Sequence, residues 1–333
     1  TYGDWSSDVC SSDLIVIVAC RGGIVGRGVI ESDRLAAGRV HDDGERHRGG
    51  AAVPLFDDGV ADGDGGDDLD DAVEAAEYFA HAPLPKGNRP LSGVRMLDLT
   101  RVLAGPACAK AFAEHGADVI RITRKDLPDL GPPSDVDTGI GKLQAHIDMR
   151  DPADAARMQA LVKDCDVFLQ GYRPGSLAAR GLSPEALAKA RPGIIYTQLS
   201  AWGHEGPWAG KRGYDTVVQS FNGMAWRPND EKPAFLPGSP HDYLAGYLLA
   251  FGTMVALHRR ATIGGSWMVR TSLAGTGEWF RKLPRFTPEQ YNNLPGELPD
   301  DVLKRLLMSH ESPWGHVTHL APAAQLSETP GRW

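Results

Sequence analysis

The sequence is poor in the features that define several common classes of protein. Its 333 residues include only four cysteines, which are scattered and form neither a CxxC pair nor a His/Cys cluster with zinc-ligand spacing. Its longest mainly apolar stretch without a charge, residues 243–257, is shorter than the ~20 residues that a membrane helix needs. Its basic residues are dispersed rather than interleaved with aromatic residues on one face. We therefore expect a cytoplasmic protein without disulfides or a membrane span, and one that does not bind nucleic acid.

The first 90 residues are far more acidic than the rest of the chain. They hold 18 acidic and 8 basic residues, and eight aspartates lie among glycines in residues 57–71. An EF-hand loop that started at Asp62 would need glycine at its sixth position and an acidic residue at its twelfth, where the chain has Asp67 and Val73. We therefore expect no bound metal, and we interpret this stretch as a solvated acidic linker.

Composition divides the chain into four segments. Residues 1–71 begin with a short tandem repeat and continue as the acidic stretch, so we interpret them as a non-native or disordered N-terminal segment. Residues 72–90 are expected to form one short helix and a proline-rich connector. Alternating strand and helix patterns predict an α/β domain over residues 91–275. The proline-rich, polar residues 276–333 predict an irregular tail.

The order of the predicted elements indicates the fold class. Strands are predicted at residues 94–99, 119–123, 167–170, 194–199 and 267–271, and helices at residues 108–117, 184–191, 214–224 and 241–260. A further helix is predicted to begin at residue 152, with a buried face that extends to residue 162. Asp151 and Ser183 are expected to cap two of these helices, because each stands directly before a proline that suits the first helical position. Strands alternating with helices predict a Rossmann-like, doubly wound, mostly parallel α/β sheet with helical additions. Its ligand should bind at the carboxyl ends of the strands.

The first crossover of this predicted sheet does not carry a dinucleotide fingerprint. There is no GxGxxG motif, and the second strand ends in Thr123-Arg124-Lys125 where NAD enzymes place an acidic residue for the ribose. Two cations at this place suit a phosphate on a ribose, as in NADP or coenzyme A. An NADP-dependent oxidoreductase is therefore one alternative, although the missing glycines argue against it.

Five ordered motifs resemble the family III coenzyme A transferases. They are LSGVRMLDLTRVLAGPAC from Leu91 with HGADVIRI from His115, IDMR from Ile147, QGYRPGSL from Gln170, GHEGPW from Gly203 with GYDTVVQ from Gly213, and PHDYLAGYLLAFG from Pro240 with GGSWMVRTSL from Gly264. The resemblance covers about residues 90–280 and implies a Rossmann-like homodimer. It also implies transfer of coenzyme A from an acyl-CoA to a small carboxylic acid.

By the same resemblance, Asp242 is the catalytic nucleophile that attacks the acyl-CoA thioester. From the local pattern alone, an aspartate before an apolar helix is an N-cap, so a purely structural role stays open. For the adjacent His241 we favour a surface or positioning role, because an ionised aspartate needs no general base. The related α-methylacyl-CoA racemases have histidine where this chain has Tyr214, which favours transfer over a racemase-like reaction.

The resemblance further implies a set of residues that bind coenzyme A. They are Val102, Leu103, Ala104, Arg124, Ile147, Asp148, Met149, Arg150, Gly171, Tyr172 and Tyr214. Cations among them would meet phosphates, and Tyr172 would form an apolar wall. The chain departs from the family at Ala179, where members often have an arginine. Arg180 follows one step late, a shift that turns a helical side chain by about 100°.

A second departure concerns the end of the chain. Members of the family usually continue past the aspartate into a smaller domain, whose glycine-rich loop covers the acyl intermediate. This chain ends sooner, so we expect an incomplete member of the family. An inactive relict that binds coenzyme A weakly or not at all is therefore an alternative to a working transferase.

Overall fold

The structure is a computed structural model in which most of the predicted α/β domain can be described. The described residues are 15–21, 24–30, 87–127, 131–226, 232–284, 286–287, 289–290, 295–324 and 326–333. The acidic residues 57–71 and the short helix predicted within residues 72–90 lie outside them.

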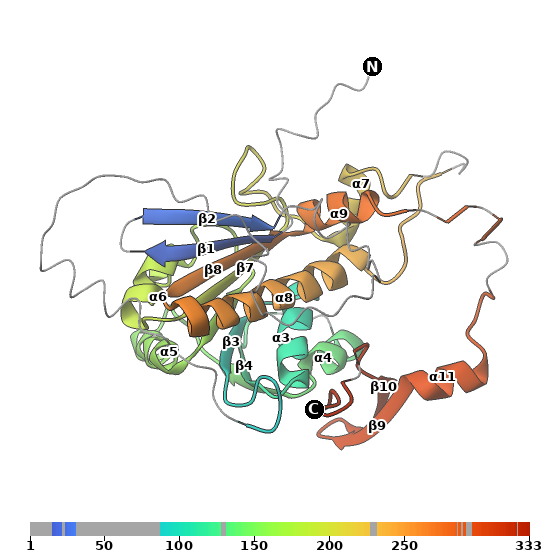
Figure 1. The fold of residues 1–333 in the computed structure, drawn as a ribbon, viewed down its shortest axis with the longest axis horizontal. Coiled ribbons are helices and arrows are strands. Elements are labelled where there is room, and N and C mark those ends of the chain that lie inside the picture. The colour runs from blue at the N-terminus through green and yellow to red at the C-terminus, as the bar shows by residue number, and fades with distance from the viewer. Residues whose placement is uncertain are drawn as a thin grey trace, which may run out of the picture.

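Eight described strands form the main sheet (Figure 1). They are β1 (Ile15–Arg21), β2 (Ile24–Ile30), β3 (Arg95–Leu99), β4 (Asp118–Thr123), β5 (Lys142–His146), β6 (Val167–Gln170), β7 (Ile195–Ser200) and β8 (Ser266–Ser272). Neighbouring strands run parallel in the order β5, β4, β3, β6, β7 and β8. Strand β1 pairs antiparallel with β8, and β2 pairs antiparallel with β1. The prediction of a doubly wound, mostly parallel α/β sheet is confirmed.

Helices connect these strands and extend the chain beyond them. They are α3 (Ala104–Glu114), α4 (Pro132–Gly139), α5 (Pro152–Asp164), α6 (Pro184–Ala190), α7 (Asp215–Phe221), α8 (Pro240–Ile263), α9 (Leu273–Arg281), α11 (Asp300–Leu306) and the short 3₁₀ helix η1 (Ala178–Arg180). Asp151 accepts hydrogen bonds from the backbone N–H groups of Ala153 and Asp154, and Ser183 accepts one from that of Ala186. Both predicted caps are therefore confirmed. None of the described helices is both long and apolar enough to span a membrane.

The helices cover both faces of the sheet. On one face, α3 and α8 pack Phe112 and Leu249 against the strands, and Figure 1 shows these two helices on the same side of the sheet. On the other face, Met158 and Val162 of α5 and Leu187 of α6 form a second apolar cluster. The two clusters together bury the central strands on both sides, and every residue of β3 and β6 except Arg95 is buried.

The strand order reverses direction between β3 and β6. From β3 the chain winds outward to β4 and β5, whereas β6, β7 and β8 follow one another on the other side. The loops after β3 and β6 therefore diverge at the carboxyl edge of the sheet. In doubly wound sheets this switch point is where the ligand crevice forms.

Helix α8 crosses α3 at close range beside this switch point. A Cβ atom on Gly246 would lie 2.5 Å from the carbonyl oxygen of Ala104 and 2.9 Å from the Cβ of Ala107. No larger residue fits at position 246 without moving one helix away from the other. The small residues thus bring the N-terminal part of α8 against the first turn of α3, at the carboxyl end of β3.

Two segments differ from the prediction. Residues 15–21 and 24–30 fall inside the segment interpreted as non-native or disordered, yet they form the paired strands β1 and β2, which extend the main sheet past β8. The tail expected to be irregular contains α11 and a hairpin of β9 (Leu307–Ser312) and β10 (Gly315–Leu320). Both predictions were based on composition, whereas these strands are held by backbone pairing, which tolerates many side chains.

Candidate active site

A cavity of about 470 Å³ opens at the carboxyl ends of β3, β6, β7 and β8. Its wall includes Leu99 at the end of β3, Ala104 at the start of α3, and Leu273 at the start of α9. Asp242 of α8 also lines it. Its volume is in the range of cavities that bind small molecules, and its position is the one expected of a ligand site in this fold.

The cavity gathers half of the residues that the sequence predicted for the site. The predicted residues that line it are Val102, Ala104, Gly171, Tyr172, Tyr214 and Asp242. They come from the loop after β3, the loop after β6, the residue before α7, and α8. Residues far apart in the sequence therefore share one cavity, and the predicted nucleophile is among them.

Asp242 is the third residue of α8, so the prediction that it is the N-cap was wrong. The N-cap is Ser239, whose side chain makes no capping hydrogen bond. The Asp242 side chain is 6% exposed. Burial is the main cause that raises the pKa of Asp242 to about 7, and the charge of Asp215 adds to the shift. Within the described part of the chain, no hydrogen bond to its carboxylate is found. Asp242 is therefore a buried acid with a raised pKa whose carboxylate no described residue holds by a hydrogen bond.

Asp215, the first residue of α7, supplies the cap that α8 lacks. Its Oδ2 accepts hydrogen bonds from the backbone N–H groups of His241, at 2.7 Å, and Asp242, at 3.2 Å. Its Oδ1 accepts one from the Nε2 of Gln219, at 2.5 Å. Burial acts to raise the pKa of Asp215, but the nearby His241 ring and the hydrogen bonds from Gln219 and the backbone N–H of Asp242 lower it below its ordinary value. An ionised carboxylate therefore sits under the first turn of α8, where backbone N–H groups need acceptors.

His241 is fully buried, so of the two predicted roles the surface role is excluded. Its Nε2 lies 3.0 Å from Nδ2 of Asn222, and its Nδ1 lies 3.6 Å from Oδ2 of Asp215. The ring therefore bridges the end of α7 and its beginning. It precedes Asp242 in sequence but is not among the residues that line the cavity.

The loop between β3 and α3 is held in a strained conformation. Val102 has a φ of 71°, which is unfavourable for a β-branched side chain. The buried Asp98 below it accepts a hydrogen bond from the backbone N–H of Thr100, at 3.0 Å, and pairs with Lys142 Nζ, also at 3.0 Å. Lys142 in turn donates to the carbonyl oxygen of Pro106, at 2.8 Å. This buried ion pair fixes both ends of the loop and so holds Val102 at the cavity wall.

The charged residues around the cavity are almost all cations. Arg101, Arg173, Lys211 and Arg212 line it, and Asp242 is the one acidic residue among its described lining residues. Lys211 Nζ stands 4.0 Å from the ring centre of Trp208 in a cation–π contact. Such a lining suits an anionic ligand.

Three other predicted residues form a separate charged cluster at the carboxyl ends of β4 and β5. Arg124 pairs with Asp126 at 2.8 Å, and Arg150 pairs with Asp148 at 2.5 Å and with Asp126 at 3.4 Å. The hydrogen bonds from Arg150 lower the pKa of Asp148 to about 2. We refer to Arg124, Asp126, Asp148 and Arg150 as the β4–β5 charge cluster. Its cations are at the expected edge of the sheet, but they are paired within the protein.

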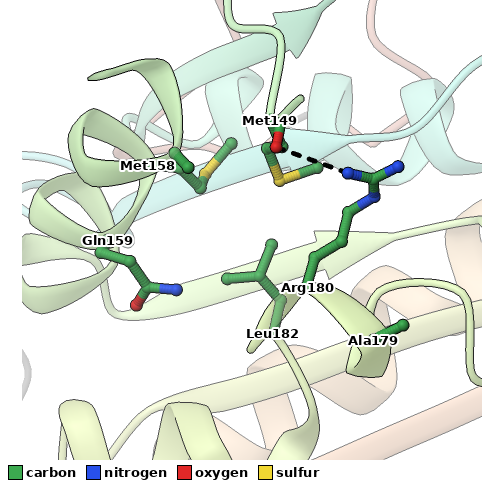
Figure 2. A pocket seen from close by; sticks show the side chains of 7 residues that line it. Met149, Met158, Gln159, Ala179, Arg180 and Leu182 are labelled. Carbon is green, nitrogen blue, oxygen red and sulfur yellow. Dashed lines mark hydrogen bonds between the residues drawn. The ribbon is translucent and has the colours of Figure 1, made fainter. Parts of the chain in front are cut away.

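Met149 lines a second, smaller cavity of about 170 Å³, shown in Figure 2. Ala179 and Arg180 face it from η1, and Met158 from α5. The guanidinium of Arg180 donates a hydrogen bond from Nη1 to the carbonyl oxygen of Met149, at 3.4 Å. Arg180, which follows the family position by one residue, thus reaches the turn after β5.

The remaining two predicted residues line neither cavity. Leu103 is the N-cap of α3, and the side chain of Ile147 is buried in the apolar cluster beneath α5. Sequence reasoning also missed residues that matter to the geometry, above all Asp215 and Asn222. The sequence did contain a signal for Asp215, because Asp215 and Gln219 are four residues apart, the spacing at which two side chains share one face of a helix. Nothing in the sequence indicated that Asn222 contacts His241.

Comparison with protein families identifies one family over the described domain. The sequence model of CoA-transferase family III matches residues 91–287. This range begins just before β3, includes the cavity and the β4–β5 charge cluster, and ends after α9. It contains each of the five motifs noted in the sequence.

Individual proteins with similar sequences and structures agree with this match. An acyl-CoA transferase of Gibberella moniliformis is 32% identical over 257 residues, which are 73% of this chain and 43% of that protein. A mouse succinyl-CoA:glutarate CoA-transferase is 35% identical over 182 residues, 50% of this chain and 41% of that protein. The crystal structure of a CAIB/BAIF family protein from Brucella suis superposes with a TM-score of 0.53 at 28% identity, over 57% of this chain and 55% of that one. The chain thus spans less than half the length of these two curated relatives.

Proposed function

The chain belongs to CoA-transferase family III, and on that premise we propose that it moves coenzyme A from an acyl-CoA to a carboxylic acid through a covalent intermediate on Asp242. The observation that carries the proposal is the state of this carboxylate. It is buried, it faces a cavity whose other charged lining residues are cations, and no hydrogen bond to it is found among the described residues. A carboxylate in this position is free to react, whereas a structural cap would be bonded to backbone N–H groups.

The proposed reaction begins when a carboxylate oxygen of Asp242 attacks the carbonyl carbon of the thioester. The C–S bond breaks, coenzyme A leaves as the thiolate, and a mixed anhydride joins Asp242 to the acyl group. The thiolate then attacks the aspartyl carbonyl carbon, which releases the donor acid as its carboxylate and leaves an aspartyl-CoA thioester. In each step one anion attacks and one anion leaves, so no proton has to move.

The acceptor acid reverses these two steps. Its carboxylate oxygen attacks the aspartyl-CoA thioester, which expels the thiolate and forms a new mixed anhydride. The thiolate attacks the acyl carbon of the acceptor, which yields the new acyl-CoA and frees the Asp242 carboxylate. Covalent capture retains the energy of the thioester through both halves, because each step passes the acyl group to a carboxylate or a thiolate and not to water.

The ionisation of Asp242 sets the pH at which this chemistry starts. Only the carboxylate form is nucleophilic, and a pKa of about 7 leaves Asp242 about half ionised at neutral pH. Desolvation, which raises this pKa, also makes the anion more reactive once it has formed. The position of Asp242 in the first turn of α8 places it near the positive end of the helix dipole, which favours the anion.

We assign the binding of coenzyme A to the remaining cavity residues and the β4–β5 charge cluster. The narrow wall of Val102, Ala104 and Gly171 suits a pantetheine arm, and Tyr172 supplies an aromatic surface beside it. The cations of the cavity and of the β4–β5 charge cluster suit the phosphates of the nucleotide. Phosphate binding at Arg124 or Arg150 would require them to exchange their present partners Asp126 and Asp148.

The two alternative activities considered from the sequence, a racemase-like reaction and an NADP-dependent oxidoreductase, have less support. A racemase needs a base beside the thioester, and the cavity presents Tyr214, 55% exposed, at the position where racemases have histidine. His204, whose pKa is lowered to about 3 by burial and by the charge of Arg270, is not among the lining residues. Family membership also removes the basis for an NADP-dependent oxidoreductase. The predicted homodimer and cytoplasmic location stay predictions.

Covalent trapping tests the proposed function. The protein is incubated with an acyl-CoA, quenched with hydroxylamine and digested, and we expect a hydroxamate on the peptide that contains Asp242. The Asp242→Asn variant should give no adduct. Asp164→Asn, which makes the same change at an exposed position at the end of α5, should label as the wild type does. An adduct on a different residue would overturn the assignment, and binding of coenzyme A without any adduct would identify an inactive relict.

A further inference from the structure

A buried imidazole stands beside the nucleophile, and the proposed reaction makes no use of it. His241 precedes Asp242 in α8 and is completely enclosed. Its two ring nitrogens face different partners, Asn222 and Asp215. Because Asp215 also binds the backbone of Asp242, the protonation pattern of this ring bears directly on the reactive carboxylate.

The orientation of the Asn222 side chain follows from its other neighbour. The backbone N–H of Met224 donates a hydrogen bond to Asn222 Oδ1, at 3.2 Å. A backbone N–H can only donate, so the oxygen of this amide must lie at that end. The amide nitrogen Nδ2 therefore faces Nε2 of His241, at 3.0 Å.

This orientation selects one tautomer of the ring. Nδ2 of Asn222 can only donate, so Nε2 of His241 accepts and carries no hydrogen. The neutral imidazole then has its hydrogen on Nδ1. That atom is buried and has no hydrogen-bond partner in the described part of the chain, and it lies 3.6 Å from Oδ2 of Asp215. The N–H dipole is thus directed toward an anionic carboxylate at slightly more than hydrogen-bond distance.

We propose that His241, held by Asn222 as the Nδ1–H tautomer, is a positioning residue that keeps the carboxylate of Asp215 under the first turn of α8. In this position the carboxylate of Asp215 accepts hydrogen bonds from the backbone N–H groups of residues 241 and 242, and these bonds fix the direction in which Asp242 faces the cavity. The inference rests on the proposed function only in naming Asp242 as the reacting group.

Helix α9 packs directly against the pair of His241 and Asn222. A Cβ atom on Gly277 would overlap both Nδ2 of Asn222 and Nε2 of His241, so the backbone of α9 lies directly against their hydrogen bond. On the side of α9, a side chain larger than that of glycine at position 277 would displace this pair. A glycine in the interior of a helix costs stability, and here close packing against the pair explains its presence.

The charged groups that face Asp242 come from several elements. Asp215 belongs to α7, and the cavity adds Tyr214 and the cations at positions 101, 173, 211 and 212. None of these is altered by a change at His241 or Asn222. A shift in the pH dependence of such a variant can therefore be traced to Asp215 and the ring beside it.

The first test is spectroscopic and does not depend on activity. Long-range ¹H–¹⁵N correlation of protein labelled at histidine nitrogen should show His241 at pH 8 with Nδ1 protonated and Nε2 free, its signals assigned by their loss in His241→Leu. The Asn222→Asp variant offers Nε2 an acceptor instead of a donor, so in it Nε2 should become protonated. A wild-type spectrum with the hydrogen on Nε2 would overturn the inference.

The second test uses two substitutions of similar size. Asn at position 241 can place its amide N–H near the site of Nδ1–H, whereas Leu cannot donate. We expect His241→Leu to lower kcat at least tenfold with KM for the acyl-CoA within about threefold, and His241→Asn to recover most of the loss. Circular dichroism and thermal unfolding confirm that both variants fold. Equal kcat values for folded Leu and Asn variants would contradict a positioning role.

The two tests separate this inference from the proposed function. If the wild type gives neither transfer nor an Asp242 adduct, the proposed function fails, yet the tautomer measured by NMR still decides the state of the ring. If transfer and adduct are normal but His241→Leu leaves kcat and its pH dependence unchanged, the inference fails and the proposed function stands.

Discussion

Two groups of acidic residues at the carboxyl edge of the sheet differ sharply in environment. The carboxylate of Asp242 is buried beside that of Asp215, and the pKa of Asp242 is raised to about 7. In the β4–β5 charge cluster, Asp148 is met by Arg150, chiefly through side-chain hydrogen bonds, and its pKa is lowered to about 2. The same type of side chain is therefore about half ionised at neutral pH in one region, where we propose that it is the nucleophile, and an ionised ion-pair partner in the other. Desolvation without a cationic partner makes the difference.

The largest effect should come from removing the poised carboxylate. We expect Asp242→Asn to lower the rate of CoA transfer at least 1,000-fold, because an amide cannot form the anhydride. Steady-state rates with an acyl-CoA and a carboxylic acid measure the loss. The protein must be freshly purified and free of deamidation. If Asp242→Asn then keeps more than a tenth of wild-type activity, the buried carboxylate of Asp242 is not the nucleophile, and the proposed difference in role between the two regions is wrong.

Neutralising the neighbouring carboxylate should change the pH dependence. The charge of Asp215 helps to raise the pKa of Asp242, so Asp215→Asn should move the acidic limb of the kcat profile from near pH 7 to lower pH. We also expect roughly a 10- to 100-fold loss of kcat at pH 8, because the cap on α8 is weakened. The exposed Asp164→Asn control should leave the limb in place, and a limb that stays near pH 7 in Asp215→Asn would contradict the coupling.

The two regions should affect stability in opposite directions with pH. The folded-state pKa of Asp242 is raised from 3.8 to about 7, so its contribution to stability is present below pH 4 and is lost as the pH rises through 7. At pH 8 Asp242→Asn should therefore be more stable than the wild type, by at most about 4 kcal/mol. The folded-state pKa of Asp148 is lowered, so its contribution is present above pH 4 and is lost toward pH 2.

Denaturant unfolding at pH 5 and pH 8 measures these contributions. The gain from Asp242→Asn should be larger at pH 8 than at pH 5. Asp148→Asn should never be more stable than the wild type at either pH. A gain from Asp242→Asn that is the same at both values would show that the carboxyl group is not desolvated as the structure has it.

The smallest effect should come from the exposed cluster. Arg150 is solvent-exposed and already paired, so Arg150→Gln should not measurably change the midpoint of thermal unfolding. If it binds a phosphate of coenzyme A as proposed, KM for the acyl-CoA should rise about 3- to 10-fold while kcat is unchanged. Lys163→Met, which removes an exposed cation of α5, is the matched control. An unchanged KM in Arg150→Gln would remove the β4–β5 charge cluster from the ligand site.

The sequence predicted the central strands well and the edges poorly. β3, β4 and β7 were placed to within a residue at each end, and β6 was placed without error, because strands covered on both faces read as apolar runs. β5 was missed, since most of its side chains are exposed or partly exposed and give no apolar pattern. The hairpin of β1 and β2 was missed because the composition of the N-terminal residues was weighted above the apolar run in residues 15–19.

The candidate site shows the same limit. Resemblance located Asp242, Tyr214 and the loops after β3 and β6, all of which meet at one cavity. It did not locate the contact between His241 and Asn222, which are 19 positions apart, or the cap that Asp215 provides from 27 positions away. Those contacts arise from the way α7, α8 and α9 pack together, and no local pattern encodes them.

Isotope transfer from the acceptor acid tests covalent capture by Asp242 most directly. With an acceptor labelled by ¹⁸O in both carboxylate oxygens, the mixed anhydride leaves one labelled oxygen on the aspartate after turnover. Mass spectrometry of the peptide that contains Asp242 should therefore show ¹⁸O in the wild type, dependent on the acyl-CoA. Formation of the new acyl-CoA with no ¹⁸O in that peptide would contradict the account.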